Sequence, residues 1–117
     1  MIILSNNNPQ DTLSKDENVT VNNNYLSNIR AHLIISGKVQ GVYFRKYTQE
    51  ISIKNKVSGW VRNLKNGNVE CILEGLPSNV EKVIEWCHMG PKNGRVDKID
   101  INYETYTGEF QGFKIDG

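Results

Sequence analysis

The sequence predicts an α+β fold, with two helices on one face of an antiparallel sheet of four to five strands. Three observations lead to this prediction. Short β-prone runs and helical patterns alternate over residues 30–117 in the order strand, helix, strand, strand, helix, strand, strand. A tight-turn signal separates the second and third strands. The second helical pattern has a single apolar stripe, as expected for a helix that packs on a sheet.

The first strand is predicted at residues 31–36, a short apolar run of high β propensity. A loop between Gly37 and Gly41 follows, and apolar residues then recur at spacings of three and four. This spacing predicts a helix that ends near Asn55, with polar Ser52 and Asn55 on its inner stripe.

Two further strands are predicted at residues 58–63 and 69–74, joined as a hairpin by Asn66-Gly67. This dipeptide is the strongest short hairpin signal in the chain.

The second helix is predicted to start at Ser78, which forms a capping box with Glu81, and to end at Gly90-Pro91. Residues 99–103 and 110–115 are predicted to be the last two strands. Two strand-helix-strand units in this order give the ferredoxin-like split βαβ arrangement, in which both helices share one face of the sheet.

The length of 117 residues and the formal net charge of +1 allow one domain with one modest core. Such a mild positive balance suits a small anionic ligand rather than a nucleic acid, for which clustered Lys and Arg are expected. No apolar run approaches the roughly 20 residues of a spanning helix, and the first four residues are too few for a signal peptide. A cytoplasmic protein without a membrane or nucleic-acid partner is predicted.

Residues 1–28 are rich in Asn, Ser and Asp and show no sustained hydrophobic period. Such a segment cannot bury enough apolar surface to offset the entropy lost on ordering. We expect an asparagine-rich, disordered N-terminal extension over residues 1–28 and a folded domain over residues 29–117.

Two cysteines, Cys71 and Cys87, lie within apolar patterns, which favours buried free thiols in a reducing compartment over a disulfide. Together with His32 and His88 they lack the spacing of a zinc site. No carboxylate cluster is available for Mg²⁺, so neither a metal nor another cofactor is predicted.

The most informative segment, residues 37–45, joins the first strand to the first helix. A loop at a helix N-terminus presents unpaired N–H groups and a partial positive charge, which stabilise an anion. Gly41 allows a tight turn, and Arg45 offers a planar fork of donors that suits two phosphate oxygens. The residues themselves leave two alternatives open, an anion site or an ordinary connection with a surface arginine.

Two familiar kinds of phosphate-binding loop do not fit the sequence. Gly37-Lys38 is followed by Val39 instead of the Lys-Ser/Thr pair of a P-loop. Neither Cys71 nor Cys87 has an Arg six residues later, which disfavours a cysteine-based phosphatase.

Two long motifs resemble the acylphosphatase family. Residues 37–45, GKVQGVYFR, are similar to its first signature, G-x-V-Q-G-V-x-F-R. Residues 59–69, GWVRNLKNGNV, are similar to its second, G-W-V-x-N-x-x-x-G-x-V. With Gly90-Pro91 and the closing residues 113–115, the resemblance covers about residues 30–117.

The resemblance implies a ferredoxin-like enzyme that hydrolyses the carboxyl-phosphate bond of acyl phosphates without a metal. Nothing in the sequence requires more than a monomer, so a monomer is expected. Arg45 would bind the phosphate and Asn63 would position the attacking water, while inorganic phosphate would be both product and inhibitor. The phosphate-binding loop would consist of Gln40, Gly41, Val42, Tyr43, Phe44 and Arg45.

Two alternatives belong to other classes. A non-catalytic anion-binding or regulatory module could keep the same fold, although the Arg45 and Asn63 pair argues against it. An RNA-binding sheet would need two or three exposed aromatic residues on adjacent central strands, and the aromatic residues here are scattered. The chain also departs from the family near the end of the first helix, where Ser52, Asn55 and Lys56 replace the usual Ala, Leu and Gly.

Overall fold

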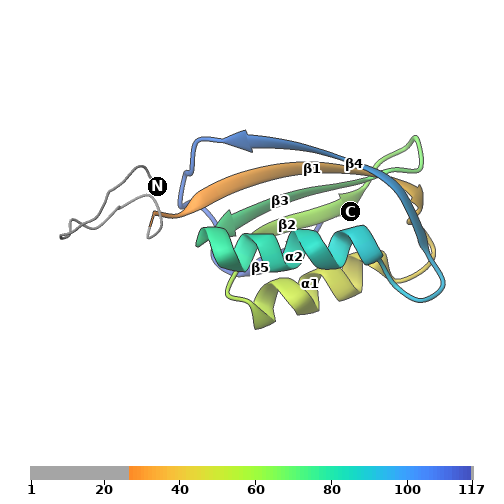
Figure 1. The fold of residues 1–117 in the computed structure, drawn as a ribbon, viewed down its shortest axis with the longest axis horizontal. Helices are drawn as coiled ribbons and strands as arrows, with labels where there is room; N and C mark the ends of the chain where they lie inside the picture. Colours follow the sequence, from red (N-terminus) through yellow and green to blue (C-terminus); the bar gives the residue numbers. More distant parts are fainter. Residues whose placement is uncertain (1–26, 117) are drawn as a thin grey trace, which may run out of the picture.

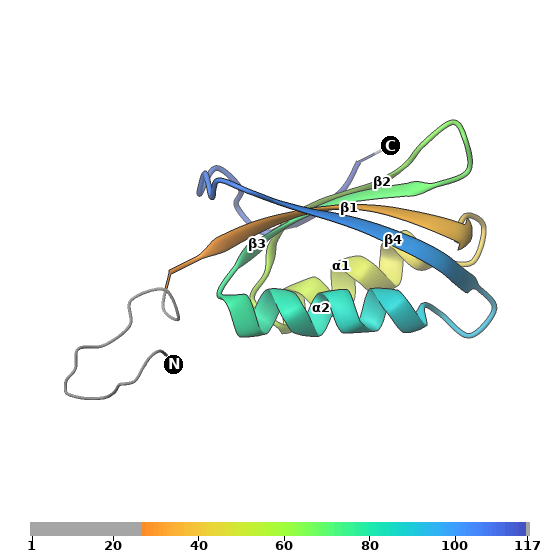
Figure 2. The same cartoon turned by 45° about the horizontal axis from the view of Figure 1, so that its top comes forward.

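The computed structural model describes residues 27–116, which form a sheet and a layer of two helices packed on one of its faces (Figures 1 and 2). Every strand and helix expected from the sequence is present. The elements in chain order are β1 (Ile29–Lys38), α1 (Phe44–Lys54), β2 (Ser58–Asn63), β3 (Val69–Gly75), α2 (Pro77–Met89), β4 (Arg95–Glu104) and β5 (Phe113–Ile115).

Within the described residues the strand order is β4-β1-β3-β2-β5. The first four strands pair antiparallel, as predicted, and the hairpin places Asn63 opposite Val69. The last strand, β5, runs parallel to β2, so the complete sheet is mixed. The reason is topological: after β4 the chain crosses to the opposite edge and reverses direction before it pairs with β2.

The core lies between the sheet and the two helices, as the α+β prediction requires. Alternation along β1 turns Ala31, Leu33 and Ile35 toward the helices, and each is fully buried. The helices contact each other through Phe44 and Trp86, whose ring centroids lie 5.3 Å apart. The start of α1 is thereby fixed against both the sheet and α2.

The second helix begins one residue before the predicted start. Pro77 occupies its first turn, and Leu76 is the N-cap residue without a side-chain cap hydrogen bond. The fixed φ of proline suits the first helical position, where its missing N–H costs nothing. Ser78 therefore lies inside the first turn, and the predicted capping box with Glu81 is wrong.

The first helix ends at Lys54, where the chain has polar residues in place of the family's usual apolar ones and glycine. Lys56 takes up a left-handed backbone with a φ of 58°. The Asn55 side chain donates to the Ile51 carbonyl at 2.9 Å. Ser52 is fully buried, and its hydroxyl has no hydrogen-bond partner among residues 27–116.

The segment between β4 and β5 is held by one carboxylate at the end of the sheet. Glu74 is 1% exposed. It accepts hydrogen bonds from the Thr107 N–H at 3.0 Å, the Thr107 hydroxyl at 2.9 Å and the Gly108 N–H at 3.1 Å. Arg30 donates to the same carboxylate at 3.1 Å. The return of the chain toward β5 is therefore fixed in position.

Three sequence expectations remain. The predicted extension lies outside the described residues, except for Ser27 and Asn28. Both cysteines are free and buried, as predicted. No helix in the described part of the chain has the length and apolar character needed to cross a membrane.

Candidate active site

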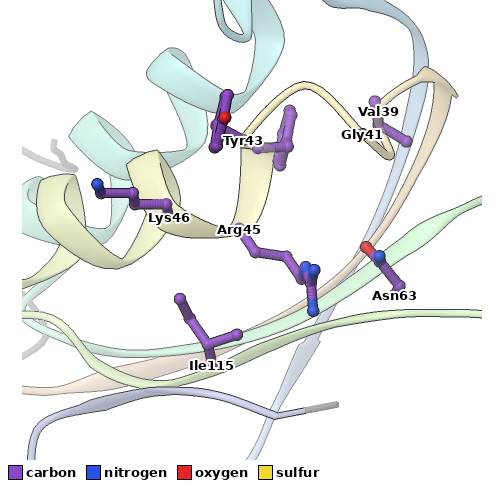
Figure 3. A pocket seen from close by; sticks show the side chains of 8 residues that line it. Val39, Gly41, Tyr43, Arg45, Lys46, Asn63 and Ile115 are labelled. Atoms are coloured by element: carbon purple, nitrogen blue, oxygen red, sulfur yellow. The ribbon is translucent and has the colours of Figure 1, made fainter.

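A cavity of about 350 Å³ opens between the start of α1, the end of β2 and the end of β5. Arg45 lies in the first turn of α1, and Asn63 is the last residue of β2. Figure 3 shows the Arg45 guanidinium pointing toward the Asn63 amide. The fold thus places at one cavity the two side chains that the sequence singled out, although 17 residues separate them along the chain.

The loop before α1 turns its backbone through two left-handed positions. Gly41 has a φ of 76°, and Tyr43 has a φ of 65° and a ψ of 23°. Tyr43 is the N-cap residue, and no side chain caps the helix. The N–H groups of a first helical turn have no intrahelical partner, so this end of α1 presents donors and a positive dipole end to an anion.

Gln40 fixes this loop to the hairpin between β2 and β3. Its side-chain amide donates to the carbonyl of Leu64 at 2.8 Å and to that of Asn68 at 2.9 Å. Leu64 directly follows Asn63, so the two hydrogen bonds set the loop's position relative to the Asn63 side chain. The hairpin itself is closed by the Asn66 side chain, which accepts from the Asn68 N–H at 3.0 Å.

The Asn63 side chain has a hydrogen-bond acceptor without a partner in the described structure. Its Oδ1 is buried and has no hydrogen-bond partner among residues 27–116. A buried polar atom without a partner costs roughly 1–3 kcal/mol. Such an acceptor at the wall of a cavity suits a bound water or substrate, which would satisfy it.

The opposite wall of the cavity comes from β5. Ile115 lines it, and the strand is held by its parallel pairing with β2 and by Gln49 of α1, which donates to the Phe113 carbonyl at 2.9 Å. Lys46 adds a second cation to the lining, with its side chain turned away from the Arg45 guanidinium (Figure 3), and no Asp or Glu of the described chain lines the cavity. The electrostatic character of the site therefore favours anions.

The model of the acylphosphatase family matches residues 31–115. The chain belongs to the acylphosphatase family. An acylphosphatase of Pyrobaculum islandicum is 50% identical over 91 residues, which make up 77% of this chain and 96% of that protein. One of Pelotomaculum thermopropionicum is 47% identical over 90 residues, or 77% of this chain and 98% of the relative.

A solved structure agrees with these relatives. The crystal structure of acylphosphatase from Bacillus subtilis superposes with a TM-score of 0.74 at 29% identity and covers 76% of this chain and 99% of that one. Acyl phosphate hydrolysis is the activity that membership supports, and nothing in the comparisons favours the non-catalytic module.

Four of the six residues of the predicted phosphate-binding loop line the cavity. Gly41, Tyr43, Phe44 and Arg45 line the cavity together with Asn63. Two predicted loop residues do not line it. These are Gln40, whose side chain turns to the hairpin, and Val42, which is buried in the core.

Sequence reasoning missed three lining residues, Val39, Lys46 and Ile115. Val39 belongs to the first signature and Lys46 directly follows it, so their proximity to the signature was the available signal. Nothing local to Ile115 revealed it, because its place depends on the parallel pairing of β5.

Other catalytic chemistries find little support in the described residues. Burial raises the pKa of the Cys87 thiol to about 12 and that of Cys71 well above its usual value. Both thiols are therefore protonated at neutral pH and shielded from substrate. No group of three or more His, Cys, Asp or Glu between residues 27 and 116 is arranged to hold a metal ion.

Proposed function

We propose that the cavity between α1, β2 and β5 hydrolyses the carboxyl-phosphate bond of acyl phosphates. The products are a carboxylate and inorganic phosphate, and the reaction uses in-line attack of a water without a metal. The single observation that carries this proposal is the meeting of Arg45, the left-handed loop and Asn63 at one cavity. Membership of the acylphosphatase family supports it.

The phosphate is held by the loop and Arg45. Backbone N–H groups of residues 40–45 and the positive end of α1 surround the phosphoryl oxygens. The Arg45 fork binds two of these oxygens and stabilises the charge on them as the bond to the acyl oxygen loosens. Since these donors are fixed before substrate arrives, they need little rearrangement in the transition state.

The attacking water is positioned by Asn63. Its unpartnered Oδ1 accepts a hydrogen bond from the water, which sets the direction of the oxygen lone pair toward phosphorus. An amide has the further advantage of carrying no charge that would repel the anionic substrate. Holding the water in line converts an encounter with solvent into an oriented attack.

The leaving group needs no proton. A carboxylic acid has a pKa of about 4, so the departing carboxylate is stable at neutral pH without a general acid. The described lining contains no His, Asp or Glu, which agrees with a reaction of this kind.

The decisive experiment measures phosphate release from benzoyl phosphate and from phenyl phosphate, each with and without a chelator. We expect turnover of benzoyl phosphate only, unchanged by chelation, with inorganic phosphate as a competitive inhibitor. Equal turnover of the monoester, or a loss of activity that Mg²⁺ or Zn²⁺ restores, would show that the chemistry is misassigned.

We also propose that residues 29–117 work as a monomer in the cytoplasm, without a nucleic-acid or membrane partner, and that residues 1–28 are dispensable. The two buried free thiols suit a reducing compartment. Deletion of residues 1–28 should change the free energy of unfolding by less than about 1 kcal/mol and leave turnover intact. A larger loss in denaturant titrations would contradict this.

A further inference from the structure

The cavity has two sides that differ in chemistry. On one side of Arg45 lies the neutral amide of Asn63. On the other side lie Lys46 and Ile115, which line the same cavity, and the Lys46 side chain turns away from the guanidinium (Figure 3).

An in-line displacement assigns these sides to different parts of the substrate. The attacking oxygen and the leaving oxygen stand on opposite faces of phosphorus. If Asn63 holds the water, as the proposed function requires, the acyl group must leave on the side away from Asn63. That side is walled by Ile115 and Lys46.

We propose that Lys46 selects acyl phosphates whose acyl group bears a second negative charge, such as a carboxylate or a phosphate, remote from the bond that breaks. The inference rests on the proposed function and adds to it the class of acyl group. Ile115 contacts the carbon part of the acyl group, and the ammonium of Lys46 pairs with its charged end.

Lys46 is accessible to substrate, and its ammonium has no carboxylate partner within the described residues. Its side chain is exposed, and it forms no ion pair with any residue from 27 to 116. Three arginines of the sheet differ in this respect, since each is bound by carboxylates of the chain. They are Arg30, Arg62 and Arg95.

The direction of the Lys46 side chain determines which anionic group of the substrate its ammonium can pair with. Because Lys46 turns away from Arg45, its ammonium is remote from the phosphoryl oxygens and suits a charge at the far end of the acyl group. The flexible stem of lysine allows acyl groups of different length. No acidic residue in the described lining opposes this pairing.

Two substrates of equal size test the inference. In 4-carboxybenzoyl phosphate a rigid ring holds a carboxylate opposite the reacting group, and in 4-carbamoylbenzoyl phosphate a neutral amide takes its place. We expect the natural chain to show a kcat/KM about two- to five-fold higher for the carboxylate, the size expected of one exposed ion pair. The ratio should approach one at high salt.

Three variants locate the preference. Lys46→Gln should remove it and Lys46→Arg should keep it, while Lys46→Glu should reverse it. Lys54→Gln is the matched control, since Lys54 is an exposed lysine in the last turn of the same helix and does not line the cavity. We expect this control to retain the preference in full.

A ratio near one in the natural chain, or a preference that Lys46→Gln leaves unchanged, would overturn the inference. So would a control variant that loses the preference as completely as Lys46→Gln. If benzoyl phosphate itself were not hydrolysed, the proposed function would fail instead, so the two failures are distinguishable.

Discussion

The two ends of α1 share one kind of backbone strain and differ in what surrounds it. Tyr43 precedes the helix with a φ of 65°, and Lys56 follows it with a φ of 58°. Among residues 27–116 these are the two non-glycine residues with positive φ. Each costs roughly 1–2 kcal/mol relative to an ordinary backbone.

At the N-terminal end the strained residue belongs to the cavity wall and to a loop that is fixed from several directions. Gln40 binds the hairpin, and the Tyr43 carbonyl accepts from the Tyr47 N–H at 3.1 Å. At the C-terminal end Lys56 is exposed, and its N–H reaches only the Ile53 carbonyl at 3.1 Å. The same conformation thus shapes a binding site at one end and merely ends a helix at the other.

The largest effect is expected at the two side chains for which a catalytic role is proposed, Arg45 and Asn63. Arg45→Ala should weaken phosphate inhibition and lower turnover together, and Arg45→Lys should rescue poorly because lysine lacks the planar fork. Asn63→Ala should lower turnover by about 10²-fold while phosphate still binds with nearly normal affinity. The inhibition constant for inorganic phosphate and the turnover number, measured for each folded variant, test both expectations.

Near-normal turnover of Asn63→Ala would end the water-positioning role. The same conclusion would follow if this variant lost phosphate affinity as severely as Arg45→Ala.

A smaller effect is expected from releasing the loop without touching substrate. Gln40→Ala removes two hydrogen bonds to the hairpin, each worth roughly 1 kcal/mol, and should lower kcat/KM by about 10-fold. Asn55→Ala is the control, because it loses one side-chain hydrogen bond of similar length at the far end of α1, away from the cavity. Phosphate affinity should fall only in the first variant; equal losses in both would show that Gln40 acts through stability alone.

Relief of strain at the C-terminal end should stabilise the fold. Lys56→Gly places at the helix end the residue that adopts a left-handed backbone most easily, so unfolding should cost about 1 kcal/mol more, with turnover unchanged. Tyr43→Gly relieves a similar strain but frees the loop, and should lower kcat/KM. Thermal unfolding and kinetics of both variants test whether the left-handed residue contributes to activity only at the N-terminal end of α1. A destabilised Lys56→Gly would refute the comparison.

The smallest effect concerns two buried hydroxyls inside the helix. Thr48 donates to the Phe44 carbonyl at 2.8 Å, whereas the Ser52 hydroxyl has no partner in the described structure. Ser52→Ala should therefore stabilise the fold by up to about 1 kcal/mol, and Thr48→Val should destabilise it by a similar amount. Denaturant titrations compare them directly. A loss of stability in Ser52→Ala would mean that its hydroxyl is satisfied after all.

Local patterns were sufficient to predict most of the fold. Asn66-Gly67 has one strong conformational preference, and the alternation along β1 distinguishes a core face from an outer face, so hairpin and layer order follow from the sequence. The start of α2 was misplaced because two local signals competed. The rigid ring of Pro77 determined the start, and the side chain of Ser78 did not.

The parts of the candidate site that depend on contacts between segments far apart in the sequence were harder to predict. Arg45 and Asn63 came from signatures, and the structure adds that they face one cavity. The hydrogen bonds of Gln40 and the place of Ile115 depend on contacts between segments far apart in sequence, 24 residues apart in the first case. The left-handed backbone of Tyr43 was also invisible, because tyrosine has no local preference for it.

The carboxylate of Glu74 makes the end of the sheet sensitive to acid. Burial alone raises its pKa, but hydrogen bonds from Thr107, Arg30 and Gly108 outweigh burial and hold the pKa below its usual value. The unfolded chain therefore binds this proton more readily than the folded one. The stabilisation is complete above the unfolded pKa of about 4.3 and disappears as the pH falls through the lower folded value. Acidification should therefore loosen the segment between β4 and β5 first, and hydrogen exchange at Thr107 and Gly108 would report it.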